Sequence, residues 1–168
     1  MVWGKMVTHI YFDWSKTLAR PKTRDIFINS KNSMKDRLAV LYPDTLPTLE
    51  YLFNKGYTLG IISNTHKRPA DFVRALSETG LIRYFKGTIA LSSDPALCKK
   101  ACAKIFNHCL KNDGLLARPD QAVMVGDDYA RDVVGGLRVG MHAVHVDRTR
   151  RSSQRLTVTT LGELVQYF

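Results

Sequence analysis

The chain of 168 residues has no apolar run approaching the about 20 consecutive residues that a membrane-spanning helix needs. Its opening stretch, Met1 to Met6, lacks the apolar core of a secretory signal, so we expect a protein that is neither secreted nor membrane-bound. Internal repeats, low-complexity tracts and a recognisable linker are also missing. We therefore expect a single domain over residues 1–168, cytoplasmic or nuclear, with a core of its own.

Cysteine is scarce, and three residues cannot all pair within one chain. Cys98, Cys102 and Cys109 fall within about 60° of one another on a helical wheel. This spacing predicts the buried face of one helix, on which cysteine acts as a small hydrophobic residue. No further ligands at a metal-binding spacing accompany them. Unpaired thiols fit a reducing compartment such as the cytoplasm.

Acidic residues are also few, because 15 Asp and Glu stand against 25 Lys and Arg, a formal net charge of +10. Residues 14–37 hold seven cations and two anions, and a second basic group comprises Arg148, Arg150, Arg151 and Arg155. Such clusters attract polyanions by electrostatic steering, although a solvated charged face explains them equally well. No nucleic-acid-binding motif accompanies them.

Short apolar runs of strand type alternate with segments of helical periodicity. The runs cover residues 7–12, 57–62, 88–91, 122–125 and 141–146, and the expected helices lie at 44–56, 70–77, 95–109 and 130–139, with a last one from 160. This alternation predicts an α/β fold, a parallel sheet of about five strands with helices on both faces. Residues 18–42 show no periodicity and are expected to form a flap or irregular insertion.

Aspartates follow two of the expected strands. Asp13 ends the first run, and Asp127 and Asp132 follow the run at 122–125. Because ligands bind at the carboxyl ends of parallel strands, we expect these side chains to meet. Carboxylates that close repel one another unless a cation lies among them, and Mg²⁺ is the simplest occupant. Helix capping is the alternative role for Asp127 and Asp132.

Four motifs, in order along nearly the whole chain, resemble those of the haloacid dehalogenase (HAD) superfamily of phosphohydrolases. Asp13 to Thr17 stand where the family has Asp-x-Asp-x-Thr, and Ser63 stands at the end of the second strand. Lys100 stands where the family has a lysine before a helix, with Lys99 as an alternative. The fourth motif matches in Gly126 to Asp132, Gly135-Gly136 and Gly140-Met141.

The resemblance implies a Rossmann-like fold and a covalent mechanism. Asp13 would attack phosphorus and form an aspartyl-phosphate, while Ser63, Asn64 and Lys100 would bind the phosphoryl group. The Mg²⁺ cofactor would be held by Asp13, the backbone carbonyl of Ser15, Asp127 and Asp132, with Asp128 the less favoured alternative to Asp132.

Ser15 departs from the family pattern, because family phosphatases use an aspartate there to protonate the leaving group. General acid–base catalysis contributes roughly 10²–10⁴-fold, and serine cannot supply it at neutral pH. Three outcomes stay open: a phosphatase that is slow or that uses a substrate with a good leaving group, a long-lived phospho-aspartate, or a catalytically impaired protein that binds phosphate or a partner. Lys16 is a further departure, since the family usually has glycine there.

The spacing of the motifs leaves no room for a large cap domain. About 30 residues separate Asp13 from Asp44, and the 37 positions from Ser63 to Lys100 are filled by one expected helix and one strand. A capless, open site suits a phosphoprotein or a nucleic-acid end, with a small phosphate ester as the alternative. The basic flap would contact a polyanion, and the protein is expected to be a monomer or a homodimer.

Overall fold

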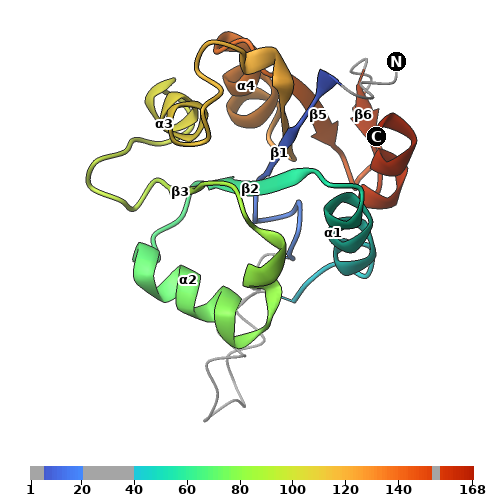
Figure 1. The fold of residues 1–168 in the computed structure, drawn as a ribbon. Coiled ribbons are helices and arrows are strands. Elements are labelled where there is room, and N and C mark those ends of the chain that lie inside the picture. The colour runs from blue at the N-terminus through green and yellow to red at the C-terminus, as the bar shows by residue number, and fades with distance from the viewer. Residues whose placement is uncertain (1–5, 21–39, 153–155) are drawn as a thin grey trace.

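A six-stranded parallel sheet forms the centre of the computed structural model, which describes residues 6–20, 40–152 and 156–168 (Figure 1). The strand order is β3-β2-β1-β4-β5-β6. The strands are β1 (His9–Phe12), β2 (Thr58–Ser63), β3 (Ile89–Leu91), β4 (Ala122–Gly126), β5 (His142–Val146) and β6 (Thr157–Val158). The five predicted strands are all present, and the two-residue β6 extends the sheet at the edge beside β5.

Helices cover both faces of the sheet. They are α1 (Thr45–Asn54), α2 (Pro69–Glu78), α3 (Lys104–Asn112) and α4 (Val134–Arg138), with short 3₁₀ helices η4 (Leu81–Tyr84), η5 (Pro119–Gln121) and η7 (Leu161–Tyr167) and a π-helical turn η6 (Tyr129–Val133). Buried side chains of α1, α2 and η7 share one core, and those of α3 share the other. The predicted α/β architecture is therefore confirmed.

Strand β1 lies at the centre of this arrangement, between β2 and β4. Ile10 and Phe12 point into one core and Tyr11 into the other, and none of the three is exposed. A strand buried on both faces reads as a continuous apolar run, which is why the sequence located it. The residue that follows, Asp13, is consequently fixed at the middle of the sheet's carboxyl edge.

The helix predicted over residues 95–109 is only partly correct. Helix α3 begins at Lys104, and residues 95–103 form a series of turns. The backbone N–H of Lys100 donates to Asn64 Oδ1 at 2.9 Å, where a helix would have directed it to a carbonyl of its own chain segment.

The predicted cysteine face is wrong for two of its three members. Cys98 and Cys102 are joined by a disulfide in the turns before α3, and Cys102 is exposed. Cys109 lies on α3 and is fully buried, as expected. The helical wheel failed because it assumed a helix that begins only after the first two cysteines.

The flap expected at residues 18–42 is described only at its two ends, since residues 21–39 lie outside the described part of the chain. Ala19 and Leu41 form an antiparallel bridge there, so the chain leaves and returns at the same place. Between Ser63 and Lys100 the structure contains α2, η4 and β3, and the described residues form no large cap domain.

Arg148 links the chain on either side of residues 21–39 to the end of β5. Its guanidinium binds both carboxylate oxygens of Asp44 at 2.9 and 3.0 Å, donates to the carbonyl of Thr17 at 2.8 Å, and stacks 3.7 Å from the ring centre of Tyr42. The sequence places Arg148 in the basic cluster near the end of the chain. It is instead largely withdrawn from solvent and paired.

Across the described ranges, no helix is both long and apolar enough to cross a membrane.

Candidate functional site

The three aspartates singled out by the sequence meet at the carboxyl edge of the sheet. Phe12 pairs with Val125 across β1 and β4, and the N–H of Asp13 donates to the carbonyl of Val125 at 2.8 Å. This register brings one carboxylate oxygen each of Asp13, Asp127 and Asp132 within 4.8 Å of one another.

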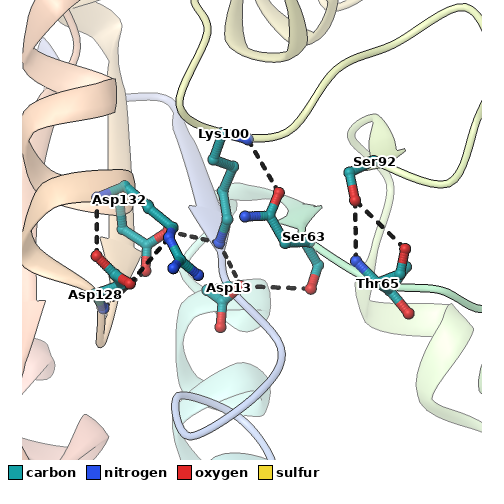
Figure 2. A network of polar contacts seen from close by, with 9 residues as sticks. Asp13, Ser63, Thr65, Ser92, Lys100, Asp128 and Asp132 are labelled. Carbon is teal, nitrogen blue, oxygen red and sulfur yellow. Dashed lines mark hydrogen bonds and ion pairs between the residues drawn. The ribbon is translucent and has the colours of Figure 1, made fainter.

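Lys100 lies between Asp13 and Asp132 (Figure 2). Its Nζ contacts Asp13 Oδ1 and forms an ion pair with Asp132 Oδ1 at 2.5 Å. The lysine is 3% exposed, whereas Lys99 is exposed to solvent. Burial alone would lower the pKa of Lys100, but the carboxylates of Asp13 and Asp132 raise it, so the ammonium stays charged at neutral pH.

Ser63 and Asn64 follow β2 on the other side of Asp13. The buried Ser63 hydroxyl donates to Asp13 Oδ1 over 3.4 Å. Asn64, expected to bind substrate, uses its amide oxygen to hold the backbone of Lys100. Asn64 thus positions the lysine in this structure.

Ser15 and Lys16 form the exposed turn after Asp13. Lys16 has a φ of 63°, a left-handed conformation that costs a non-glycine residue about 1–2 kcal/mol. Trp14 is 8% exposed and packs edge-on against Phe72, with ring centres 5.3 Å apart. Trp14 therefore anchors the turn, while Ser15 remains open to solvent.

Asp128 and Asp132 have separate tasks. Asp128 accepts a hydrogen bond from the N–H of Arg131 at 3.0 Å and pairs with its guanidinium at 3.3 Å, so it caps the following turn. Asp132 accepts from the N–H of Asp128 at 3.0 Å and turns toward Lys100. Helix capping was the alternative role for Asp127 and Asp132, but the residue that caps the turn is Asp128.

The site is short of positive charge. Burial, together with the nearby Asp13, raises the pKa of Asp127 to about 6. Burial likewise raises the pKa of Asp132 to about 7 against the opposing effect of Lys100. The ammonium groups of Lys100 and, more distantly, Lys16 therefore leave three converging carboxylates incompletely compensated, and a hard divalent cation with oxygen ligands fits such a donor set.

Gly126 allows Asp132 to approach the end of β4. A Cβ added at Gly126 would lie 2.1 Å from Asp132 Oδ2 and 2.5 Å from its Cβ. We expect Gly126→Ala to displace Asp132 and weaken Mg²⁺ binding by about 10-fold or more, as measured by titration calorimetry. Gly114→Ala cannot serve as the control, because Gly114 has a φ of 73°, which alanine rarely adopts. The control is Ala130→Gly, at an exposed position of the neighbouring turn. Unchanged Mg²⁺ affinity in Gly126→Ala would contradict this role.

His145 is a site residue that the sequence analysis missed. It lies on β5, is 8% exposed, and its Nε2 is 3.0 Å from the backbone carbonyl of Asp127. Nδ1 lies 3.2 Å from the Ser152 hydroxyl. With Nε2 protonated and Nδ1 accepting from Ser152, the ring holds the backbone beside Asp127. The sequence signal that could have pointed to it is a polar residue within the apolar run at 141–146.

Replacing His145 by phenylalanine keeps the ring but removes the hydrogen bond to Asp127. We expect Mg²⁺ affinity to fall roughly 10- to 100-fold, the usual effect of losing a group that orients a metal ligand. His108→Phe on α3 is the control, because that residue hydrogen-bonds within its own helix. Equal Mg²⁺ affinities for the two variants would show that His145 does not support the metal site.

The comparisons with known proteins point to one family of hydrolases. The family model described as haloacid dehalogenase-like hydrolase matches residues 6–146. A glyceraldehyde 3-phosphate phosphatase of Methanothermobacter thermautotrophicus is 30% identical over 80% of this chain and 60% of its own length. A phosphoglycolate phosphatase of Aliivibrio fischeri is 33% identical over 64% of this chain and 44% of its own length. The chain thus spans about half the length of these curated relatives.

Solved structures show the same fold. A HAD phosphatase from Thermococcus onnurineus superposes with a TM-score of 0.66 at 32% identity, covering 81% of this chain and 64% of the other. An uncharacterized protein from Listeria monocytogenes serotype 4b superposes with a TM-score of 0.76 at 26% identity, covering 95% and 96% of the two chains.

Proposed function

Because the chain belongs to the haloacid dehalogenase-like hydrolase family, we propose that it is a phosphohydrolase that uses Asp13 as nucleophile and Mg²⁺ as cofactor. The observation that carries this proposal is the contact of one buried lysine, Lys100, with both Asp13 and Asp132, beside the Ser63 hydroxyl. Two of its relatives bear the names of phosphatases of small phosphate monoesters, which supports the same class of reaction.

In the proposed reaction an oxygen of Asp13 attacks phosphorus as the bond to the leaving oxygen breaks. Lys100 and Ser63 both bind Oδ1, which favours attack by the other carboxylate oxygen. Their ammonium and hydroxyl groups would stabilise the phosphoryl oxygens as charge develops on them. A water molecule then attacks phosphorus, releases phosphate and restores the Asp13 carboxylate.

Asp13, Asp127, Asp132 and the backbone carbonyl of Ser15 would hold the cofactor. When bound, Mg²⁺ would offset negative charge on the carboxylates and on the transferred phosphoryl group. The leaving oxygen must take its proton from water, because Ser15 has no acidic proton to give near neutral pH. We therefore propose slow turnover, or turnover restricted to good leaving groups.

The proposed substrate is a phosphorylated macromolecule, with a small phosphate ester as the alternative. The reasons are the exposed turn at Ser15 and Lys16 and the absence of a cap domain from the described residues. Turnover of a phosphopeptide or a 5′-phosphorylated oligonucleotide should fall as salt rises, because the basic flap would attract them electrostatically. Salt-independent turnover confined to small esters would contradict this choice.

The test of the proposed function is an aryl-phosphate assay with Mg²⁺ and with a chelator. An aryl oxide leaves readily without a proton, so activity should be seen with Mg²⁺ and lost in the chelator. Absence of activity, together with retained binding of inorganic phosphate, would favour the second candidate, a protein that binds phosphate without catalysis. The observation that favours this second candidate is Ser15, which stands where family phosphatases have the acid–base aspartate.

Mg²⁺ should stabilise the fold more at high pH than at low pH. The raised pKa of Asp127, about 6 against 3.8 in the unfolded chain, means that the folded chain retains a proton that the unfolded chain has lost between about pH 4 and pH 6. The free energy of unfolding without metal therefore falls as pH rises through that window, and the freed carboxylate becomes available to Mg²⁺.

Thermal melts with and without saturating Mg²⁺ at about pH 5 and pH 8 measure this difference. The increase in melting temperature should be larger at the higher pH, and Asp127→Asn should reduce that pH dependence. Equal increases at both pH values would contradict a cation site built on Asp127.

A further inference from the structure

The turns that carry Lys100 are closed into a ring by a covalent bond. Cys98 and Cys102 are joined by a disulfide, with Lys100 midway between them. Their Cα atoms are 6.4 Å apart, within the usual range for disulfides. Residues 98–102 thus form a small covalent loop around the lysine that contacts both Asp13 and Asp132.

The two sides of this loop face different surroundings. Lys100 is 3% exposed, whereas Cys102 is exposed and Cys98 is partly exposed. A thiol in solution can therefore reach the disulfide without opening the site. The third cysteine, Cys109, is fully buried, and burial together with Asp113 raises the pKa of its thiol. Cys109 is thus poorly suited to exchange with the pair.

Among the described residues, few hydrogen bonds hold the backbone of this loop. The N–H of Lys100 donates to Asn64 Oδ1 and that of Cys102 to the carbonyl of Lys99, each at 2.9 Å. Regular helical bonding begins only with α3 at Lys104. The disulfide is therefore a main restraint on the backbone from which the Lys100 side chain reaches the acids.

We propose that Cys98 and Cys102 form a reversible redox modification site, with a dithiol as its reactant, and that the disulfide holds Lys100 in its phosphoryl-binding position. This inference rests on the proposed function, because that function gives Lys100 its role. In a reducing compartment, disulfides are mostly transient and redox-sensing. An exposed disulfide beside a buried site lysine fits that pattern.

The chemistry is thiol–disulfide exchange. A thiolate of the dithiol attacks Cys102, the bond between the two cysteine sulfurs breaks, and Cys98 leaves as a thiolate that takes up a proton. The second thiol of the reactant then attacks the mixed disulfide, releasing Cys102 and forming an oxidised dithiol. Two electrons and two protons pass from the dithiol to the protein. Oxidation by a disulfide reverses these steps.

Reduction frees the backbone of residues 98–102 to sample more conformations. Lys100 then spends less time at the distance from Asp13 that the site requires, and small displacements of positioning groups cost much activity. We expect the reduced protein to remain folded and to lose roughly three- to tenfold in kcat/KM.

The first measurement counts thiols by alkylation of the denatured protein, followed by mass spectrometry. After treatment with a disulfide oxidant, one alkylated cysteine is expected, Cys109; after treatment with dithiothreitol, three are expected. Three alkylated cysteines after oxidation would overturn the proposal.

The second measurement compares kcat/KM for an aryl phosphate before and after dithiothreitol, and after re-oxidation. Activity of the parent should fall and recover. The kcat/KM of Cys98→Ser/Cys102→Ser should equal that of the reduced parent and should not change with dithiothreitol. The kcat/KM of Cys109→Ala should change like that of the parent. Equal activity of oxidised and reduced parent would overturn control of the site by this pair.

The third measurement does not depend on activity, so it separates failure of this inference from failure of the proposed function. Trypsin cleaves after lysine, and Lys99 is exposed within the loop. Cleavage after Lys99 or Lys100 should be slower in the oxidised parent than in Cys98→Ser/Cys102→Ser, as followed on denaturing gels run with reductant. Equal cleavage rates would show that the disulfide does not restrain the loop, whether or not the protein is a phosphatase.

Discussion

Ser15→Asp should raise kcat for an alkyl phosphate by about 10²–10⁴-fold, the usual contribution of a positioned acid–base group. Ser15 is exposed and lies two residues after Asp13, so a carboxyl group can be accommodated there without displacing core side chains. A protonated carboxyl would donate to the leaving oxygen, and the carboxylate formed would then accept a proton from the attacking water. The effect should be smaller for an aryl phosphate, because an aryl oxide needs little protonation to leave.

Ser15→Asn is the matched control for this gain. Asparagine has nearly the size and shape of aspartate but cannot exchange a proton near neutral pH. Steady-state rates for the parent and both variants, with an alkyl and an aryl phosphate, separate proton transfer from a change in shape. A similar gain in Ser15→Asn, or no gain in Ser15→Asp while the parent is active, would show that the missing acid does not limit turnover.

Asp13→Asn should reduce phosphatase activity by at least about 10³-fold, to the level of the uncatalysed reaction in the assay. An amide is a poor nucleophile toward phosphorus, and its loss of charge also removes one partner of Lys100. Mass spectrometry of acid-quenched protein should find a phosphoryl group on Asp13 in the parent and none in the variant.

Asp128→Asn provides the control for Asp13→Asn. Its carboxylate pairs with Arg131 and caps a turn, so the variant should keep activity near that of the parent with a small loss of stability. Thermal melts of both variants distinguish lost chemistry from lost folding. Residual activity of Asp13→Asn close to that of the parent would exclude Asp13 as the nucleophile.

The sequence located the sheet and the acids at its edge because both signals are local. A strand buried on both faces is a continuous apolar run, and the aspartates at positions 13 and 127 follow such runs directly. The register of β1 against β4 then brings them together without further information. The serine after β2 and the lysine before α3 were found from the order of the motifs.

What the sequence did not predict depends on contacts between distant residues. The late start of α3 follows from the bond between Asn64 and Lys100, which lie 36 positions apart. The hydrogen bond from His145 to the backbone of Asp127 spans 18 positions, and no periodic pattern in the sequence predicts it. Strand β6 is two residues long, too short for any pattern to stand out.

The chain on either side of residues 21–39 is held in place by contacts that do not involve that segment. The Ala19–Leu41 bridge and the Arg148 contacts fix both ends of the segment, whatever lies between them. Lengthening a loop whose ends are already joined adds only about 0.6 kcal/mol of closure entropy for each doubling. Segments of other lengths and charges can therefore be accommodated between positions 20 and 40 while the arrangement of Asp13, Lys100 and Asp132 is preserved.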